Sequence, residues 1–366
     1  MERTGSLTGI RAVAALAVFT YHADYLHGFL GSGSFHLPGT RFGWIGVDLF
    51  FVLSGLLMGL VYAERLARPA AKAWKAYLRD RFLRIAPPYY AAILLTLQLE
   101  GVLAWLITRP GLILLYAGYG QLFVPAHAND ISPVFWTLAI EAQFYLALPL
   151  LVPLFRRWRS ATLAACIAVA LAIRGLRYGH DDNWAGLSLP AFLAHFGLGL
   201  AAAGWWRAGK LQMVARRPDA WAAAGLALVA AALLLLLPAG SPWQGSQTLL
   251  ANVLVRPVVA LGFLLVLVSL LAERSVLGRL LAARPFVWLG ERSYSLYLTH
   301  IAVLYGLWVA YPPRTVAWGA FFWAGLALSL AVAHLFHGLV EGPSLRLRDR
   351  LAGPRVRQPV PAPAAA

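Results

Sequence analysis

Residues 43–62 read GWIGVDLFFVLSGLLMGLVY, a stretch with a single acidic side chain and no basic one. A helix needs roughly 20 mostly apolar residues to cross the hydrocarbon core of a bilayer. This stretch is therefore expected to be a transmembrane helix, and similar stretches recur on both sides of it. We predict ten spans, at residues 7–23, 43–62, 86–105, 134–155, 160–175, 188–206, 220–238, 248–271, 286–311 and 316–339. The apolar residues 111–124 are too few for another span and are expected to be interfacial or re-entrant.

The composition favours a membrane protein over a soluble one. Hydrophobic residues make up 60% of the 366 residues and charged residues only 13%, whereas soluble domains carry about 25% charged residues. The net charge of +16 would suggest nucleic acid in a soluble protein, but the basic residues lie between apolar segments, so no nucleic-acid partner is expected. The single Cys166 excludes a disulfide scaffold. We predict an all-α, polytopic membrane helix bundle with about ten transmembrane helices.

The distribution of lysine and arginine predicts the orientation of these spans. With ten spans, 23 basic residues fall on the side that holds both termini, and the other side holds only Arg41, Arg109, Arg174, Arg177 and Arg314. Because basic loops stay in the cytoplasm, both termini are expected to be cytoplasmic. The membrane domain is expected to occupy residues 1–345. Residues 346–366 are expected to form a basic and then Pro/Ala-rich cytoplasmic tail that is disordered.

Ionisable side chains inside membrane spans are costly and by default mark a functional site. Arg11 and His22 lie about three helical turns apart on one face of the first span, roughly 16 Å along the axis. Snorkelling of Arg11 and a headgroup position for His22 are the alternatives. Glu141, in the fourth span, is expected near the depth of His22. The two side chains would then form either an acid/base pair or a structural ion pair.

Each of the other polar positions in the spans has both a functional and a structural explanation. Asp48 would cost at least ~2.5 kcal/mol if it faced lipid, and Ser54 lies among small residues that admit a ligand or a neighbouring backbone equally well. Arg81 and Arg84 share a helical face that suits a phosphate, although a basic loop that obeys the topology explains them too.

Polar residues also recur at helical spacing in the last two spans. Tyr297 and His300 form a polar stripe, which aromatic-belt tyrosines and a satisfied core histidine also explain. His334, His337 and Glu341 recur on one face of the last span, but no further ligand set accompanies them. We therefore expect no metal site.

Six short motifs follow one another along the chain. They are Arg11 with His22, FFVLSG at 50–55, RFLRIAP at 81–87, WTLAIEAQFY at 136–145, YSLYLTH at 294–300 and EGP at 341–343. Each motif alone is weak, but in this order the chain resembles the acyltransferase-3 family of integral membrane O-acyltransferases, from about residue 5 to residue 345. The closing motif departs from the family pattern at Gly342, where a basic residue is expected to follow the glutamate.

The resemblance implies transfer of an acyl group, often acetyl, from cytoplasmic acyl-CoA to a hydroxyl of a carbohydrate or glycolipid. It also implies a multi-pass location in the bacterial cytoplasmic (inner) membrane, contact with membrane lipid, and no bound cofactor. In this reading His22 is the general base, Glu141 orients it, and Arg11 contacts the pantetheine arm or stabilises charge. The expected substrate- and CoA-binding residues are Arg81, Arg84, Asp48, Ser54, Trp136, Tyr145, Tyr297 and His300.

Three alternatives remain open at this point. One is a non-catalytic assembly protein, which would tolerate loss of His22 and depend on the packing glycines. A covalent acyl-His22 intermediate competes with direct transfer. A transporter or flippase would use the same intramembrane charges as a proton relay and would move a glycan or lipid-linked substrate without acylating it.

Overall fold

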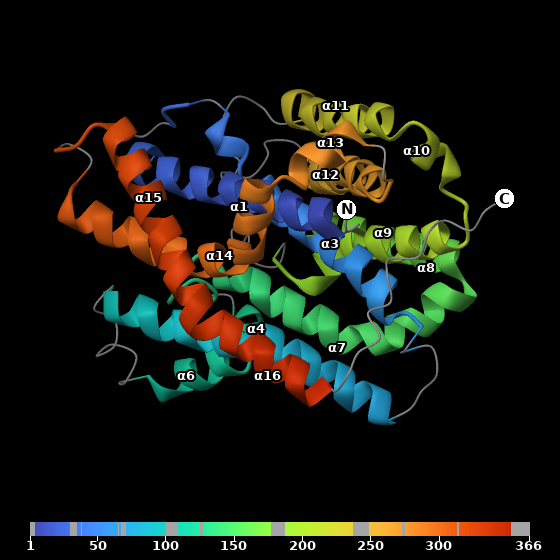
Figure 1. Cartoon of the computed structure of the whole chain (residues 1–366), viewed down its shortest axis with the longest axis horizontal. Coiled ribbons are helices and arrows are strands. Elements are labelled where there is room, and N and C mark those ends of the chain that lie inside the picture. The colour runs from blue at the N-terminus through green and yellow to red at the C-terminus, as the bar shows by residue number, and fades with distance from the viewer. Residues whose placement is uncertain are drawn as a thin grey trace.

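The computed structural model describes residues 4–29, 35–37, 39–64, 66, 71–99, 109–124, 127–176, 187–236, 249–272, 275–312 and 315–352. These residues form helices and turns without any strand, which confirms the all-α prediction. Each predicted span falls on a helix, although residues 100–105, 237–238 and 248 lie outside the described part. The helices are α1 (Thr4–Asp24), α3 (Ile45–Tyr62), α4 (Ala71–Leu99), α7 (Phe135–Arg157), α8 (Arg159–Leu176), α9 (Leu189–Arg207), α11 (Pro218–Leu236), α12 (Leu249–Leu270), α14 (Arg284–Ala310) and α15 (Trp318–Phe336) (Figure 1).

Six helical segments in the described part are long and apolar enough to cross a bilayer, so the chain is a multi-pass membrane protein. They are Thr40–Tyr62, Phe135–Arg157, Arg159–Leu176, Leu189–Arg207, Val253–Leu270 and Trp318–Ala352. Of the other long helices, α11 is apolar only over Pro218–Leu234, which is too short, and the rest are too polar. For example, α14 buries Ser293, Ser295 and His300 against its neighbours. The count of ten spans and the cytoplasmic termini stay predictions.

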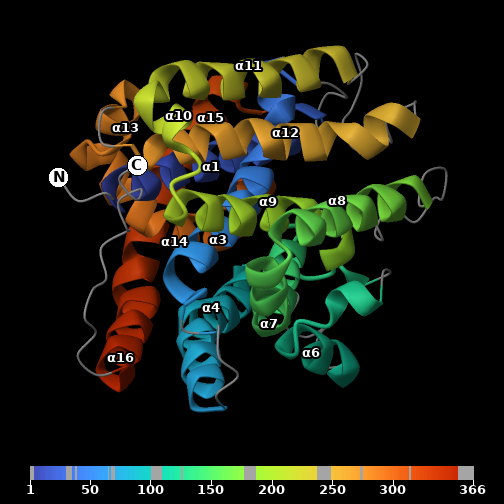
Figure 2. The ribbon, with the colours of Figure 1, turned by 90° about the vertical axis from the view of Figure 1, so that its right-hand side faces the viewer.

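Helix pairs pack closely where small residues face a neighbouring backbone. α3 packs against α9, α1 against α14, and α11 runs beside α12 (Figure 2). A Cβ on Gly55 of α3 would lie 2.3 Å from the carbonyl oxygen of Phe196, and one on Gly199 of α9 would lie 2.3 Å from that of Val52. These two glycines therefore let α3 and α9 approach more closely than larger side chains would allow.

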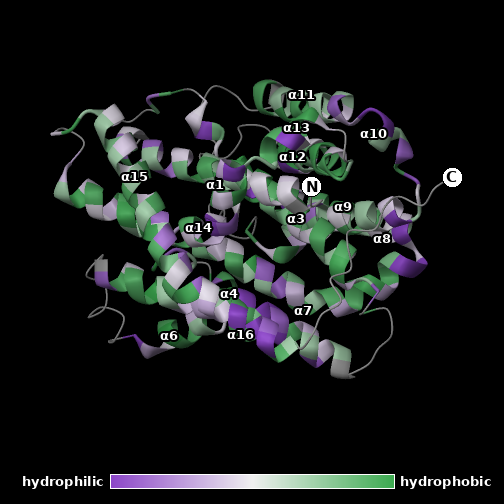
Figure 3. Ribbon diagram, viewed as in Figure 1, coloured by the Kyte–Doolittle hydropathy of each residue, from purple (hydrophilic) through white to green (hydrophobic). Residues whose placement is uncertain are grey.

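Two segments lie at the margins of the predicted spans. Within residues 111–124 the chain forms α6 (Pro110–Ala117), which is too short to cross a membrane, and a short 3-10 turn η3 (Gln121–Phe123). After α15 the π-helical turn η6 (His337–Glu341) leads into α16 (Gly342–Ala352), a hydrophilic helix that crosses α4 (Figure 3). Residues 346–352 are therefore helical, contrary to the expectation of disorder from 346, although most of their side chains are exposed. Residues 353–366 lie outside the described part.

Candidate active site

A cavity of about 560 Å³ opens among α3, α4, α7 and α14, with contributions from α1 and α16. Of the residues predicted to form the site, it brings together Arg11, Ser54, Arg81, Arg84, Glu141, Tyr145 and Tyr297. Four arginines line it. The fourth is Arg348 of α16, a residue predicted to lie in the tail. We call this space the arginine cavity.

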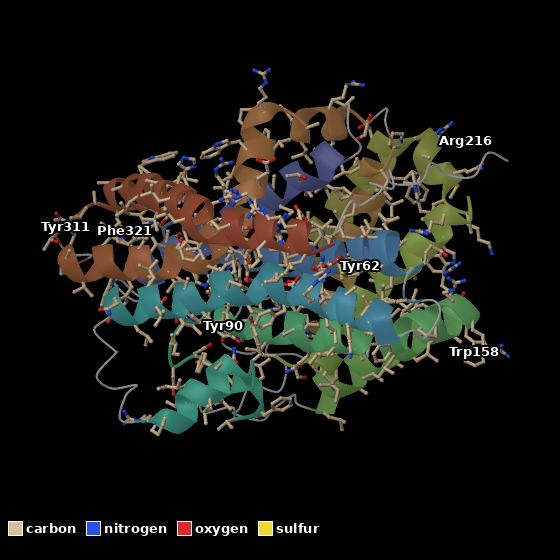
Figure 4. All side chains as sticks on the ribbon, turned by 60° about the horizontal axis from the view of Figure 1, so that its bottom comes forward. Tyr62, Tyr90, Trp158, Arg216, Tyr311 and Phe321 are labelled. Carbon is tan, nitrogen blue, oxygen red and sulfur yellow. The ribbon has the colours of Figure 1, made fainter. Side chains whose placement is uncertain are left out.

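Arg81 is held in a fixed position by α3. Its guanidinium donates a hydrogen bond to the hydroxyl of Tyr62 (2.7 Å) and lies 3.7 Å from the sulfur of Met58. The same guanidinium lies over the rings of Tyr62 (4.8 Å) and Tyr145 (5.6 Å). Tyr62 sits near the middle of the molecule in Figure 4, beside the start of α4. The phenol and the rings orient Arg81 without neutralising it, so its charge stays available to a ligand.

Arg84, one turn further along α4, is held by a buried carboxylate. Its Nη1 lies 3.6 Å from Oε1 of Glu341, a residue with no exposed surface. The other carboxylate oxygen of Glu341 accepts hydrogen bonds from Ser295 (2.6 Å) and from His337 Nδ1 (3.1 Å). No group of three or more residues able to hold a metal ion occurs in the described part of the chain. The structure thus gives Glu341 an electrostatic role.

Pro87 in α4 explains why the C-terminal arm, the helix α16 (Gly342–Ala352), docks on this turn. Pro87 has no backbone N–H, so the carbonyl of Leu83 lacks its usual donor four residues ahead. The hydroxyl of Ser344, on α16, donates to that carbonyl instead. The hydroxyl of Tyr294 donates a hydrogen bond to the carbonyl oxygen of Ile85, two residues after Leu83 (2.9 Å). These two bonds fix the backbone on either side of Arg84.

Arg11 differs from the other cavity arginines because it forms neither a hydrogen bond nor an ion pair with any residue that the structure describes. It faces the arginine cavity, where its nearest charged neighbours are Arg84, Glu341 and Glu141. Arg348 pairs with its neighbour Asp349 (2.8 Å). With that pair neutral, Arg11, Arg81 and Arg84 face two carboxylates. The cavity therefore keeps an excess of positive charge and one guanidinium whose donors are free for a ligand.

Glu141 does not form the predicted pair with His22. Its Oε1 accepts hydrogen bonds from Ser54 on α3 (2.9 Å) and from Tyr145 on its own helix (2.5 Å). Similar depth in the membrane does not place two side chains on facing surfaces. α14, which packs directly on α1, supplies the partner of His22.

That partner is His300. His300 Nδ1 lies 2.9 Å from the carbonyl oxygen of Tyr297 and 3.1 Å from that of Leu296. Carbonyl oxygens only accept hydrogen bonds, so this nitrogen carries the proton and the Nε2 of the neutral ring holds a lone pair. His22 Nδ1 lies 3.1 Å from that Nε2.

The same reasoning assigns the tautomer of His22. Its Nδ1 also lies 3.0 Å from the carbonyl oxygen of Val18, which is again an acceptor. Both neighbours of His22 Nδ1 therefore accept, so this nitrogen carries the proton and Nε2 has the lone pair. No other described residue hydrogen-bonds to His22 Nε2. A proton taken up at Nε2 would create an imidazolium that His300 and Val18 stabilise at the opposite nitrogen.

The arginine cavity and the histidine pair adjoin at Tyr297. The ring of Tyr297 lines the cavity, and its centroid lies 6.0 Å from those of His300 and Phe50. Its hydroxyl lies 2.8 Å from Oγ1 of Thr137, across to α7. His22 and His300 themselves do not line the cavity as it stands. Tyr297 therefore lies at the boundary between the charged space and the free nitrogen of His22.

Besides His300, two residues predicted to bind substrate lie outside the arginine cavity. Asp48 is completely buried outside the arginine cavity, where it accepts hydrogen bonds from Nη1 of Arg256 on α12 (2.9 Å) and from His195 on α9 (2.7 Å). Trp136 is 4% exposed and packs against aromatic rings of α3 and α9. Asp48 was predicted from the cost of a lipid-facing carboxylate and Trp136 from its motif, but both side chains point into helix interfaces and not into the cavity.

Comparison with known proteins identifies the family. The model of the acyltransferase domain matches residues 4–337. The acyltransferase MdmB of Streptomyces mycarofaciens is 28% identical over 95% of this chain and 93% of its own length. The exopolysaccharide production protein ExoZ of Rhizobium meliloti is 28% identical over 82% of this chain and 84% of its own.

A third relative, the peptidoglycan O-acetyltransferase OatA of Listeria monocytogenes, is 24% identical over 82% of this chain, which spans 49% of that protein. No solved structure matches. Nothing in these similarities supports the transporter alternative. The motifs, the helical fold and the family match over nearly the whole chain agree, so this chain belongs to the acyltransferase-3 family and is a membrane acyltransferase.

Proposed function

We propose that this enzyme transfers an acetyl or similar acyl group from acyl-CoA to a hydroxyl of a carbohydrate or glycolipid, with His22 as general base. The observation that carries the proposal is the hydrogen-bond chain through His300. It leaves His22 Nε2 unprotonated and free, and His300, which orients His22, lies one turn of α14 beyond Tyr297, a residue that lines a cavity with excess positive charge. Glu141 is no longer part of the base, and His300 replaces it as the residue that orients His22.

The arginine cavity supports acyl-CoA as the donor. Arg81 and Arg84 are fixed by Tyr62 and Glu341 in positions where they can receive phosphate oxygens of CoA. Arg11, which has free donors, lies on α1 about three turns before His22 and would meet the pantetheine arm. The ~16 Å between Arg11 and His22 along α1 is comparable to the length of an extended pantetheine arm. A cytoplasmic donor in the inner membrane could therefore serve an acceptor on the other side.

The acceptor is proposed from the names of the relatives. OatA is named for peptidoglycan O-acetylation and ExoZ for exopolysaccharide production. A carbohydrate hydroxyl is the chemistry that these names share. In the direct reaction this hydroxyl attacks the thioester carbonyl while His22 Nε2 takes its proton. The carbon–sulfur bond then breaks, and the CoA thiolate recovers a proton from the imidazolium.

Mass spectrometry of surface glycans and lipids, from cells with and without the protein, tests the function. The expected result is an added acyl mass on a glycan or glycolipid that disappears in a His22→Ala variant, whose transfer rate should fall about 10²- to 10⁴-fold. His334→Ala is the matched control, because this exposed histidine on α15 contacts only the guanidinium and ring of neighbouring surface side chains. An unmodified glycan that is nevertheless moved across the membrane would support the transporter instead. Full transfer by His22→Ala would refute the assigned base.

A further inference from the structure

A second cavity, of about 300 Å³, lies at the end of the bundle where α3, α7 and α9 finish and α8 begins. Its rim carries Arg156, Arg159, Arg207 and Glu64, and its apolar wall is Val152, Phe155 and Leu200. We call it the corner pocket. The last turns of α3 separate it from the arginine cavity, because Met58, Val61 and Tyr62 line that cavity while Gly59, Ala63 and Glu64 line the corner pocket.

The corner pocket has more positive charge than its own carboxylate can balance. Glu64 accepts hydrogen bonds from Arg156 (3.2 Å) and Arg207 (3.0 Å), which leaves one unit of positive charge on this trio. Arg159 forms no hydrogen bond or ion pair with any residue in the described part of the chain. The rim therefore carries an excess of two positive charges.

The position of Arg159 is unusual for a cation. It is the first residue of α8, where the helix dipole disfavours positive charge. Its guanidinium is laid across Gly204 of α9, so closely that a Cβ at that position would lie 2.4 Å from Nε. Neither the helix dipole nor a carboxylate stabilises this charge, whereas an anion seated in the corner pocket would.

The surroundings place the corner pocket at the boundary between membrane and water. Trp158, between α7 and α8, is 54% exposed and stands at the tip of these helices, at the end of the bundle opposite Tyr311 (Figure 4). Exposed tryptophans of this kind lie at the level of lipid headgroups. Leu150 and Leu154 are exposed on the preceding turns of α7, as lipid-facing residues would be. The basic rim is thus at headgroup depth, with an apolar wall beside it.

We propose that the corner pocket binds an anionic phospholipid, with its phosphate between Arg159 and Arg207 and an acyl chain against Val152 and Phe155. A basic rim with an apolar wall at this depth matches the chemistry of such a lipid. A zwitterionic headgroup would bring its ammonium group toward the same arginines and bind less well. A free nucleotide has no acyl chain that could pack against the apolar wall. The inference is independent of the acyl acceptor and of the role of His22.

Native mass spectrometry of the full-length protein, released from vesicles of phosphatidylglycerol and phosphatidylcholine, tests the proposal. The wild type is expected to retain phosphatidylglycerol selectively. Arg159→Gln should lower that retention about fivefold, roughly what one basic residue near an anionic surface contributes. Arg157→Gln is the matched control, because it makes the same charge change at the same corner but on a residue that stacks on Trp158 outside the pocket.

A second variant separates pocket geometry from charge. Gly204→Ala keeps every charge but pushes the flexible guanidinium of Arg159 out of place, and should also weaken retention of phosphatidylglycerol. Equal losses in Arg157→Gln and Arg159→Gln, or no loss in either, would overturn the proposal. So would equal retention of both lipids. Loss of acyl-CoA binding in Arg159→Gln with lipid retention unchanged would assign the pocket to a CoA phosphate instead, and this outcome is separable from failure of the His22 mechanism.

Discussion

His300→Ala is the sharpest test of the hydrogen-bond chain at the proposed base. The substitution removes the acceptor that lies 3.1 Å from His22 Nδ1 and leaves only the carbonyl oxygen of Val18 at 3.0 Å. His22 would keep its tautomer through Val18, but the imidazolium formed during transfer would lose one charged hydrogen bond. Such a bond contributes about 2 kcal/mol, so the expected fall in kcat is about 30-fold. His22→Ala should cost more, because it removes the base altogether.

Initial rates of acyl transfer at varied acyl-CoA concentration give the assay. Because His300 does not line the arginine cavity, KM for acyl-CoA should stay within about twofold in His300→Ala while kcat falls. His300→Gln is the conservative variant, since its side-chain carbonyl can again accept from His22, and it should recover part of the rate. A purely structural role would lower kcat equally in both variants. An increase in KM without a loss of kcat would refute the reasoning.

Three further predictions test the supports of the site. Ser344→Ala should destabilise the protein by about 1 kcal/mol and cost less in a Pro87→Ala background, where the backbone N–H returns, as measured by thermal unfolding in detergent. Glu341→Gln should raise KM for acyl-CoA several-fold with kcat little changed, because it releases Arg84, and a change in kcat alone would contradict this. Asp48→Asn should cost up to about 3–5 kcal/mol of stability, because it breaks the ion pair between this buried carboxylate and the partly buried Arg256 of α12, and a variant as stable as the wild type would refute that pairing.

Much of the arginine cavity could be predicted from the sequence, because helical periodicity and membrane depth are both local properties. Arg81 and Arg84 share a face at the spacing the sequence gives, and the polar residues of the fourth span point into the same space. What periodicity cannot supply is the direction of one helix relative to another. The predicted pair of Glu141 and His22 rested on their similar depth alone. Their helices face different neighbours, so Glu141 bonds to Ser54 and His22 to His300.

The partner of a buried charge is also a long-range property. The cost of exposing Asp48 to lipid predicts correctly that it must be paired, yet nothing near it in sequence identifies Arg256, on α12, as the partner. The docking of the C-terminal arm on α4 could not be predicted for a related reason. Its 11 residues are too polar for a span and look like a tail, and only the carbonyl that Pro87 leaves unpaired on α4 explains why Ser344 docks there.

α14 links the two halves of the proposed reaction. Within two turns it supplies Tyr294, which holds the α4 backbone beside Arg84, then Tyr297 at the end of the cavity, and then His300 against His22. A rigid helix fixes the spacing of these groups at 1.5 Å per residue. In the proposed reaction, α14 alone therefore sets the distance between a donor bound at the arginines and the base, His22. The thioester of the proposed reaction would approach His22 past Tyr297, because this ring lines the cavity and lies 6.0 Å from that of His300. The Tyr297–Thr137 hydrogen bond would then hold a wall of the acyl path as well as join α7 to α14.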